Sequence, residues 1–244
     1  MQIAKKIINM TSCQSTNSEA MTLIKEKKTT EGLVVNTFSQ TNGRGQQQNL
    51  WHSAPQSNLT FSLVLHPTFL LPTEQFQLTI ACSLALTSFL TSISGKMFQI
   101  KWPNDILYRN KKICGILIEN IIKGKTISHS IIGIGLNINQ KSFPLEKAIS
   151  LSLITNKTYD LPLLLDKLTD TILAYYGALK SNENDFKKEY LHTLFQYEEW
   201  TNYIVAEQSI TGRIIGISDI GMLRMELLNG SIQEFGLKEI RFVY

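Results

Sequence analysis

The sequence has few of the side chains that crosslink a chain or bind a metal. It contains three cysteines, an odd number, at Cys13, Cys82 and Cys114. Neither these cysteines nor the four histidines have the spacing of metal ligands. The sequence therefore argues against a disulfide framework and a zinc site, and it predicts a soluble protein of a reducing compartment, the cytoplasm.

Long apolar runs and a strong charge excess are also absent. No stretch approaches about 18 uninterrupted apolar residues, and residues 1–10 lack the apolar core of a signal peptide. The sequence thus predicts neither a membrane span nor a secretion signal. The formal net charge is +4, from 24 basic and 20 acidic side chains. This charge suits an anionic small molecule or an acidic partner protein, and it is weak evidence for nucleic-acid binding.

Glycine and proline are scarce, with 14 and 6 residues, whereas hydrophobic residues make up 43% of the 244 positions. The composition excludes a disordered or collagen-like chain, because enough apolar surface exists to offset the entropy lost on folding. The length suits one large domain, alone or with a small second one.

The apolar and β-rich patterns predict an α+β region in the first four-fifths of the chain. The expected strands cover residues 3–10, 33–38, 59–65, 98–102, 112–122 and 126–135. The expected helices cover residues 16–27, 73–93, 161–180 and 184–196. Thr16 and Glu19 have the spacing of a capping box, which is why the first helix is expected to begin there.

The sequence pattern changes after Trp200, where short β-rich runs alternate with glycine-containing turns. The expected strands of this part cover residues 203–206, 210–217, 222–228, 231–235 and 238–243. Runs of this kind predict a small β-barrel packed on the first region. The expected domains are therefore residues 1–198 and 199–244.

A long polar segment, residues 39–58, contains one charged residue, Arg44, and no acid. Gly43 and Gly45 flank this arginine and permit main-chain N–H groups to face an anion. The planar guanidinium suits a carboxylate or a phosphate, and Trp51 offers a stacking face. The neutral donors and acceptors of the segment are Gln40, Gln46, Gln47, Gln48 and Asn49. The alternative is a solvated, flexible loop that resembles an RGG-type segment, and a single GRG triplet does not decide between them. If the segment binds a ligand, the polarity of residues 39–50 predicts that they are disordered until it arrives.

A second polar cluster, KWPND at 101–105, follows an expected strand. Its Asn104-Asp105 pair is typical of a turn that caps its own backbone. One interpretation is that Lys101, Asn104 and Asp105 face a phosphate or a metal ion. The other is an ordinary strand–turn–strand with a solvated lysine.

Glycines also interrupt two expected strands. Gly115 follows Lys112 in KICGILIENII, and Gly133 and Gly135 alternate in IIGIGLNIN. The alternating pair leaves one face of the strand without side chains, where a flat group fits and Asn137 is close enough to hydrogen-bond it. Close packing of a strand against a helix is the alternative explanation of such glycines.

In this order, the motifs resemble the biotin protein ligases. The matching segments are Ser15-Thr16-Asn17, Gln40 with GRG at 43–45, Trp51, KWPND at 101–105, KICGILIE at 112–119 and GIGLN at 133–137. The resemblance implies a mixed sheet with flanking helices, related to class II aminoacyl-tRNA synthetases, followed by an SH3-like barrel. It also implies that biotin and ATP, with Mg²⁺, form biotinyl-5′-AMP, whose biotin passes to a lysine of a biotin carboxyl carrier domain.

The resemblance further implies a role for each matching residue. Lys112 is the expected catalytic residue at the junction of carboxyl and phosphate, and Arg44 lies in the loop over biotin and the adenylate. The expected biotin contacts are Ser15, Thr16, Asn17, Gln40, Gly43, Arg44, Gly45, Gly115 and Ile116. The expected ATP and adenylate contacts are Gln46, Trp51, Asn104, Asp105, Lys112 and Asn137. Asp105 is also the candidate ligand of Mg²⁺ bound with the ATP phosphates.

Two features depart from parts of the family. Gln46 stands where an arginine commonly helps to retain the adenylate. A charge-assisted hydrogen bond contributes about 1.5–3 kcal/mol against ~1 for a neutral one, so we expect the intermediate to leave about tenfold faster or more here, unless a lysine elsewhere compensates. The motifs also begin within the first twenty residues or so, so we expect no helix-turn-helix and no specific operator binding. A homodimer is compatible with the resemblance.

Two rival functions are weighed against this one. A lipoate ligase shares the fold and the adenylation chemistry, but is expected to carry an RRxSGGG-type glycine run, which is missing here. A non-catalytic RNA-binding module requires aromatic residues clustered with lysine and arginine, whereas the polar segment has only Arg44 as a charge.

Overall fold

The first region is built on a seven-stranded mixed sheet. In the computed structural model, which describes residues 3–46, 49–144, 146–182 and 185–244, the strand order is β1-β2-β3-β7-β6-β5-β4. The strands are β1 (Lys6–Met10), β2 (Leu33–Thr37), β3 (Leu59–Leu65), β4 (Gln99–Lys101), β5 (Asp105–Tyr108), β6 (Lys111–Lys123) and β7 (Thr126–Leu136). β1 and β2 are parallel, and the other neighbouring pairs are antiparallel. The expected mixed sheet is confirmed.

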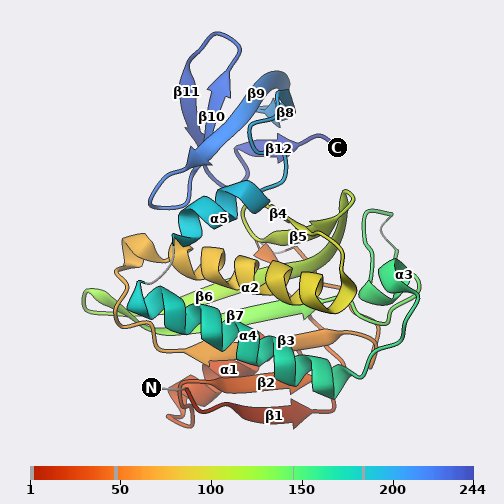
Figure 1. Cartoon of the computed structure of the whole chain (residues 1–244). Helices are drawn as coiled ribbons and strands as arrows, with labels where there is room; N and C mark the ends of the chain where they lie inside the picture. The colour runs from red at the N-terminus through yellow and green to blue at the C-terminus, as the bar shows by residue number, and fades with distance from the viewer. Residues whose placement is uncertain (1–2, 47–48, 145, 183–184) are drawn as a thin grey trace.

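Helices cover both faces of this sheet. They are α1 (Thr16–Lys25), α2 (Phe76–Ser94), α3 (Leu151–Thr155), α4 (Leu161–Ser181) and α5 (Phe186–Thr193). α2 and α4 lie side by side across one face, whereas α1 packs against β2, β3 and β7 (Figure 1). α5 packs between α2 and β4, next to the C-terminal region.

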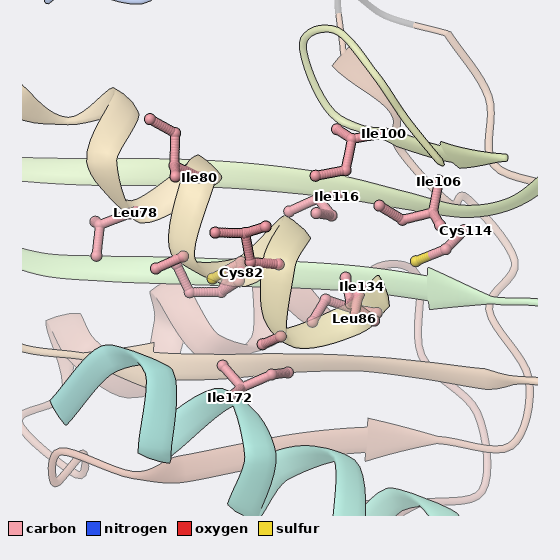
Figure 2. Close-up of a cluster of buried hydrophobic side chains, with 14 of the residues drawn as sticks. Leu78, Ile80, Cys82, Leu86, Ile100, Ile106, Cys114, Ile116, Ile134 and Ile172 are labelled. Atoms are coloured by element: carbon pink, nitrogen blue, oxygen red, sulfur yellow. The ribbon is translucent and has the colours of Figure 1, made fainter. Parts of the chain in front are cut away.

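The core lies on both faces of the sheet because successive strand residues point to opposite sides. On β2, Val34 belongs to the larger cluster under α2 and α4, whereas Leu33 and Val35 pack under α1. Figure 2 shows the larger cluster, to which Ile116 of β6, Cys82 of α2 and Ile172 of α4 all contribute. Complete burial of each such side chain stabilises the fold by about 1.5–3 kcal/mol.

The helical segment Pro72–Ser94 is apolar and long enough to cross a membrane, and 61% of its most apolar window is buried inside the fold. This burial is what a core helix of a globular domain requires. The segment therefore serves as the main helix over the sheet.

The C-terminal region is an antiparallel sheet of five strands with the order β11-β10-β9-β8-β12. They are β8 (Thr201–Val205), β9 (Gln208–Ile217), β10 (Leu223–Leu227), β11 (Ile232–Phe235) and β12 (Ile240–Phe242). The expected small β region is confirmed, but within the described residues no pairing of β11 with β12 closes it into a barrel. The boundary between residues 198 and 199 stays a prediction.

The two regions are in close contact. The indole N–H of Trp102, a buried residue just after β4, donates to the Gly221 carbonyl at 2.9 Å. Gly221 has φ +89, and a Cβ there would lie 2.4 Å from the Phe76 ring, so this turn requires glycine. The contact joins the start of α2, the end of β4 and the turn before β10.

Some local predictions were wrong. The first helix is preceded by Ser15 as N-cap, and Thr16 is its first residue, so Thr16 and Glu19 form no capping box. Asp105 begins strand β5, and the short helix α3 was also not predicted. Of the expected residues, Gln47, Gln48 and position 184 lie outside the described part of the chain.

Candidate active site

A cavity of about 520 Å³ opens where the polar segment, the β6–β7 strands and the C-terminal sheet meet. Most of the site residues expected from the sequence line it. They are Ser15, Thr16, Asn17, Gln40, Arg44, Gly45, Gln46, Trp51, Asn104, Asp105, Lys112, Gly115 and Ile116. Gly43 and Asn137 do not line it, although Gly43 lies against Gln40 and Trp51, which do.

One end of the cavity carries neutral hydrogen-bonding groups. The backbone N–H of Thr16 donates to Gln40 Oε1 at 2.9 Å. Ser62, buried on β3, places its hydroxyl 2.7 Å from Thr16 Oγ1 and 2.5 Å from Asn17 Oδ1. A Cβ on Gly43 would lie 2.5 Å from Gln40 Nε2, so glycine is needed there for the glutamine to fit. These groups suit an uncharged polar ring.

The glycine-lined face of β7 is covered by side chains of the chain itself. A Cβ on Gly135 would lie 2.2 Å from the Trp51 indole, and a Cβ on Gly133 would lie 2.4 Å from Asn17 Oδ1. The flat group expected over this face is therefore Trp51. Its Nε1 is buried and, among the described residues, has no hydrogen-bond partner.

Lys112 lies away from the neutral groups along β6, five positions before Leu117, whose carbonyl accepts a hydrogen bond from Asn17 Nδ2 at 3.3 Å. Its ammonium is 2.6 Å from Asp105 Oδ1 and 5.6 Å from the centroid of the Trp51 ring. A Cβ on Gly115 would lie 3.1 Å from Lys112 Nζ, so the lysine runs along the surface that this glycine leaves open. The ammonium thus lies over the cavity floor beside a carboxylate and an aromatic face.

Arg44 is held by a residue that sequence reasoning missed. Its guanidinium is 3.2 Å from Glu119 Oε2, and the same oxygen accepts a hydrogen bond from Asn17 Nδ2 at 2.7 Å. Glu119 is the last residue of KICGILIE and lies four positions after Gly115 on β6. The two-residue period of a strand puts both on one face, and this was the available signal.

Two residues expected to contact the nucleotide, Asn104 and Asn137, form hydrogen bonds within the protein itself. The Asn104 side-chain amide donates to the Ile116 carbonyl at 2.6 Å, and the Asn104 main-chain carbonyl accepts from the Ile116 N–H at 3.0 Å. Asn137 is buried and donates to the Ile149 carbonyl at 3.1 Å, while its Oδ1 has no partner among the described residues. Their roles toward ATP stay predictions.

The cavity also contains cations from distant parts of the chain. They are Lys101, Lys147, Lys238 and Arg241. Burial lowers the pKa of Lys101, and the charges of Lys112 and Lys147 lower it further, while Asp105 opposes the shift. The site therefore favours an anion at this end.

The described residues contain no group of three side chains able to hold a metal ion by themselves. Asp105 is the one carboxylate among the described residues lining the cavity. Mg²⁺ in nucleotide sites is commonly held by one or two carboxylates together with phosphates, so a single aspartate fits that mode of binding.

A model of the biotin/lipoate A/B protein ligase family matches residues 10–137, which include the neutral end, the polar segment and Lys112. The chain belongs to this family. It is 40% identical to the bifunctional ligase/repressor BirA of Bacillus spizizenii over 126 residues, which are 50% of this chain and 38% of BirA. It is 32% identical to the biotin–[acetyl-CoA-carboxylase] ligase of Paracoccus denitrificans over 126 residues, 51% of each chain. The match thus spans about half, or less, of these curated relatives.

The fold of this family member extends the similarity to nearly the whole chain. The biotin protein ligase from Aquifex aeolicus, solved in complex with biotin and ATP, superposes with a TM-score of 0.79 and 29% identity. The superposition covers 97% of this chain and 98% of the other. The α+β region and the C-terminal sheet therefore both belong to the shared architecture.

Proposed function

We propose that this protein is an ATP-dependent biotin protein ligase. The observation that carries the proposal is one continuous cavity with neutral hydrogen-bonding groups at one end and lysines at the other. Such a cavity suits a substrate with an uncharged ring and a carboxylate that is joined to a nucleotide phosphate. The similarity to the Aquifex ligase with bound biotin and ATP supports the same assignment.

In the first half-reaction, a biotin carboxylate oxygen attacks the α-phosphorus of ATP, and pyrophosphate leaves. Negative charge accumulates on the phosphate oxygens, and the Lys112 ammonium stabilises this charge by exchanging Asp105 for the phosphate. The neutral groups at Thr16 and Gln40 hold the ureido ring, so that the carboxylate meets the nucleotide in a fixed orientation.

In the second half-reaction, the uncharged amine of a carrier lysine attacks the acyl carbon of biotinyl-5′-AMP. An amide forms, AMP leaves, and the amine loses a proton. Arg44, released from Glu119, covers the mixed anhydride and limits its hydrolysis by water. Asp105 is the residue that would hold Mg²⁺ bound with the nucleotide, and the ion would neutralise phosphate charge there.

The expected partner is a biotin carboxyl carrier domain, and the expected compartment is the cytoplasm. Lack of operator binding, lack of membrane attachment and a homodimer all stay predictions.

Pyrophosphate exchange tests the proposal. The protein is incubated with biotin, Mg²⁺, ATP and labelled pyrophosphate, and label is expected in ATP only when biotin is present. Lys112→Ala should abolish exchange while keeping the circular-dichroism spectrum. Lys111→Ala is the matched control, because Lys111 is the exposed neighbour on the same strand and does not line the cavity.

Lipoate in place of biotin separates the two kinds of ligase in the family. Exchange with lipoate and none with biotin contradicts the proposal, and so does undiminished exchange in Lys112→Ala.

A further inference from the structure

The cations that line the cavity differ in what neutralises them. Arg44 pairs with Glu119, Lys112 with Asp105, and Arg241 with Glu207. Lys101, Lys147 and Lys238 pair with no Asp or Glu side chain within 4.0 Å in the part of the chain that the structure describes. Among the described residues, these three lysines are therefore the cavity cations without an acidic side chain as partner.

Two of the three lie against the same aromatic ring. Lys147 Nζ is 4.3 Å from the Tyr244 ring centroid, and Lys101 Nζ is 5.7 Å from it. Lys101 Nζ is also 5.2 Å from the centroid of Phe242, on β12. The two ammoniums thus converge on one side of the cavity, next to the Lys112–Asp105 pair.

These lysines are close enough to one another to interact unfavourably. Both Lys147 and Lys112 lower the pKa of Lys101, in addition to its burial. A cluster of like charges in partly buried surroundings is relieved when a polyanion binds among them. Aromatic faces stabilise such cations only modestly compared with a charge-assisted hydrogen bond, so the rings can be exchanged for phosphate oxygens.

The backbone of Lys147 is fixed beside Lys112. The Lys112 N–H donates to the Lys147 carbonyl at 2.7 Å, and the Ile149 N–H donates to the Lys112 carbonyl at 3.0 Å. This short parallel pairing attaches the segment before α3 to the first residues of β6. The position of Lys147 therefore does not depend on its own side chain.

We propose that Lys147 is a phosphate-binding residue of this site, which together with Lys101 holds the β- and γ-phosphates of the nucleotide. Lys147 and Lys101 supply positive charge from outside the polar segment, where Arg44 is the single charge. The proposal rests on the proposed function and names the residues that hold the leaving group of its first half-reaction. Lys147 exchanges the Tyr244 ring, and the Tyr244 main-chain oxygen to which it donates, for phosphate oxygens.

Calorimetric titrations test it with wild-type protein, Lys147→Ala, Lys147→Arg and the control Lys157→Ala. Lys157 is exposed, follows α3 and does not line the cavity. Each protein is titrated with biotin, and then, with biotin saturating, with pyrophosphate and with α,β-methylene-ATP. In Lys147→Ala, loss of one charge-assisted contact should lower the affinity for pyrophosphate and for α,β-methylene-ATP about tenfold. The affinity for biotin should stay within about twofold of wild type. Lys147→Arg should restore most of the affinity.

The outcomes are distinguishable. Unchanged phosphate affinity in Lys147→Ala overturns the role of this lysine alone, provided that the wild type binds biotin and the nucleotide analogue. Equal loss of biotin and phosphate affinity also overturns it, because it indicates a structural role beside Tyr244. Failure of the wild type to bind biotin and the analogue overturns the proposed function and this proposal together.

Discussion

Gly135 leaves the space in which the Trp51 indole lies, and this contact links two motifs far apart in the sequence. The GxG spacing predicted a bare strand face. It did not predict that the protein itself covers that face, because the position of an aromatic ring from a distant loop depends on how the loop folds back. Sequence patterns thus identified the surface, and the tertiary structure identified what lies on it.

Gly135→Ala should displace this ring. The new methyl group would lie 2.2 Å from the indole, and overpacking of this kind costs roughly 1–3 kcal/mol. We expect a lower urea midpoint and weaker binding of biotin and nucleotide. Gly177→Ala is the control, because a Cβ there meets no atom within 4 Å and the helix α4 should become slightly more stable. Equal stability and affinity of the two variants would contradict the explanation.

Gln46→Arg should slow the loss of biotinyl-5′-AMP. Gln46 lines the cavity, and an arginine there adds a charge-assisted contact to the phosphate, which is expected to slow dissociation about tenfold. Stopped-flow measurement of adenylate release tests this, with Gln233→Arg on β11, outside the cavity lining, as the control. Release as fast as in the wild type would contradict the expectation that the neutral side chain at position 46 weakens retention of the adenylate.

At the scale of elements, the period-two and helical patterns predicted the long strands and helices because burial on one or both faces imposes them. β5 was not predicted, since its four residues follow Pro103-Asn104 and begin with Asp105, a sequence that also suits a turn. The pairing of Lys147 with the start of β6 is a contact between segments about 35 residues apart. No local spacing indicates such a contact.

Lys101, the last residue of β4, is affected by the nearby lysines Lys112 and Lys147. Its pKa lies below the ordinary value of 10.5 because of burial and of the nearby Lys112 and Lys147. Protonated Lys101 attracts phosphate and neutral Lys101 does not, so nucleotide affinity should fall as the pH rises through this lowered pKa. Lys101→Arg should flatten the profile, because arginine stays protonated.

Titration of α,β-methylene-ATP between about pH 7 and 10 measures this effect. Profiles of the same shape in the wild type and in Lys101→Arg would assign the pH dependence to another group.

At the scale of the whole molecule, the cavity is completed by the C-terminal sheet. Sequence reasoning placed the ring-binding and carboxyl-activating residues in the first region and assigned none to the second. The structure adds Arg241 and Phe242 of β12 to the lining. Such contributions depend on the orientation of one sheet against another, which hydrophobic patterning within each sheet does not encode.

Trp102→Phe tests how much the site depends on the contact between the two regions at Trp102 and Gly221. The change removes the 2.9 Å hydrogen bond to the Gly221 carbonyl and leaves a buried acceptor unpaired, at a cost of about 1–3 kcal/mol. We expect lower stability to urea and weaker nucleotide binding. Trp200→Phe is the control, because the Trp200 ring is 46% exposed and lies over Arg213. Nucleotide affinity equal in both variants would show that this contact has no influence on the site.

The environment of Trp51 gives the protein an optical property. Trp51 lines the cavity, its indole nitrogen has no hydrogen-bond partner among the described residues, and the Lys112 ammonium lies 5.6 Å from its ring centroid. Of the other two tryptophans, Trp102 donates a hydrogen bond to the Gly221 carbonyl, and Trp200 lies outside the cavity lining. When phosphate draws the Lys112 ammonium away, the electric field at this chromophore changes. Its emission should then shift in wavelength and intensity, so that loading of an unlabelled molecule is visible in a fluorimeter.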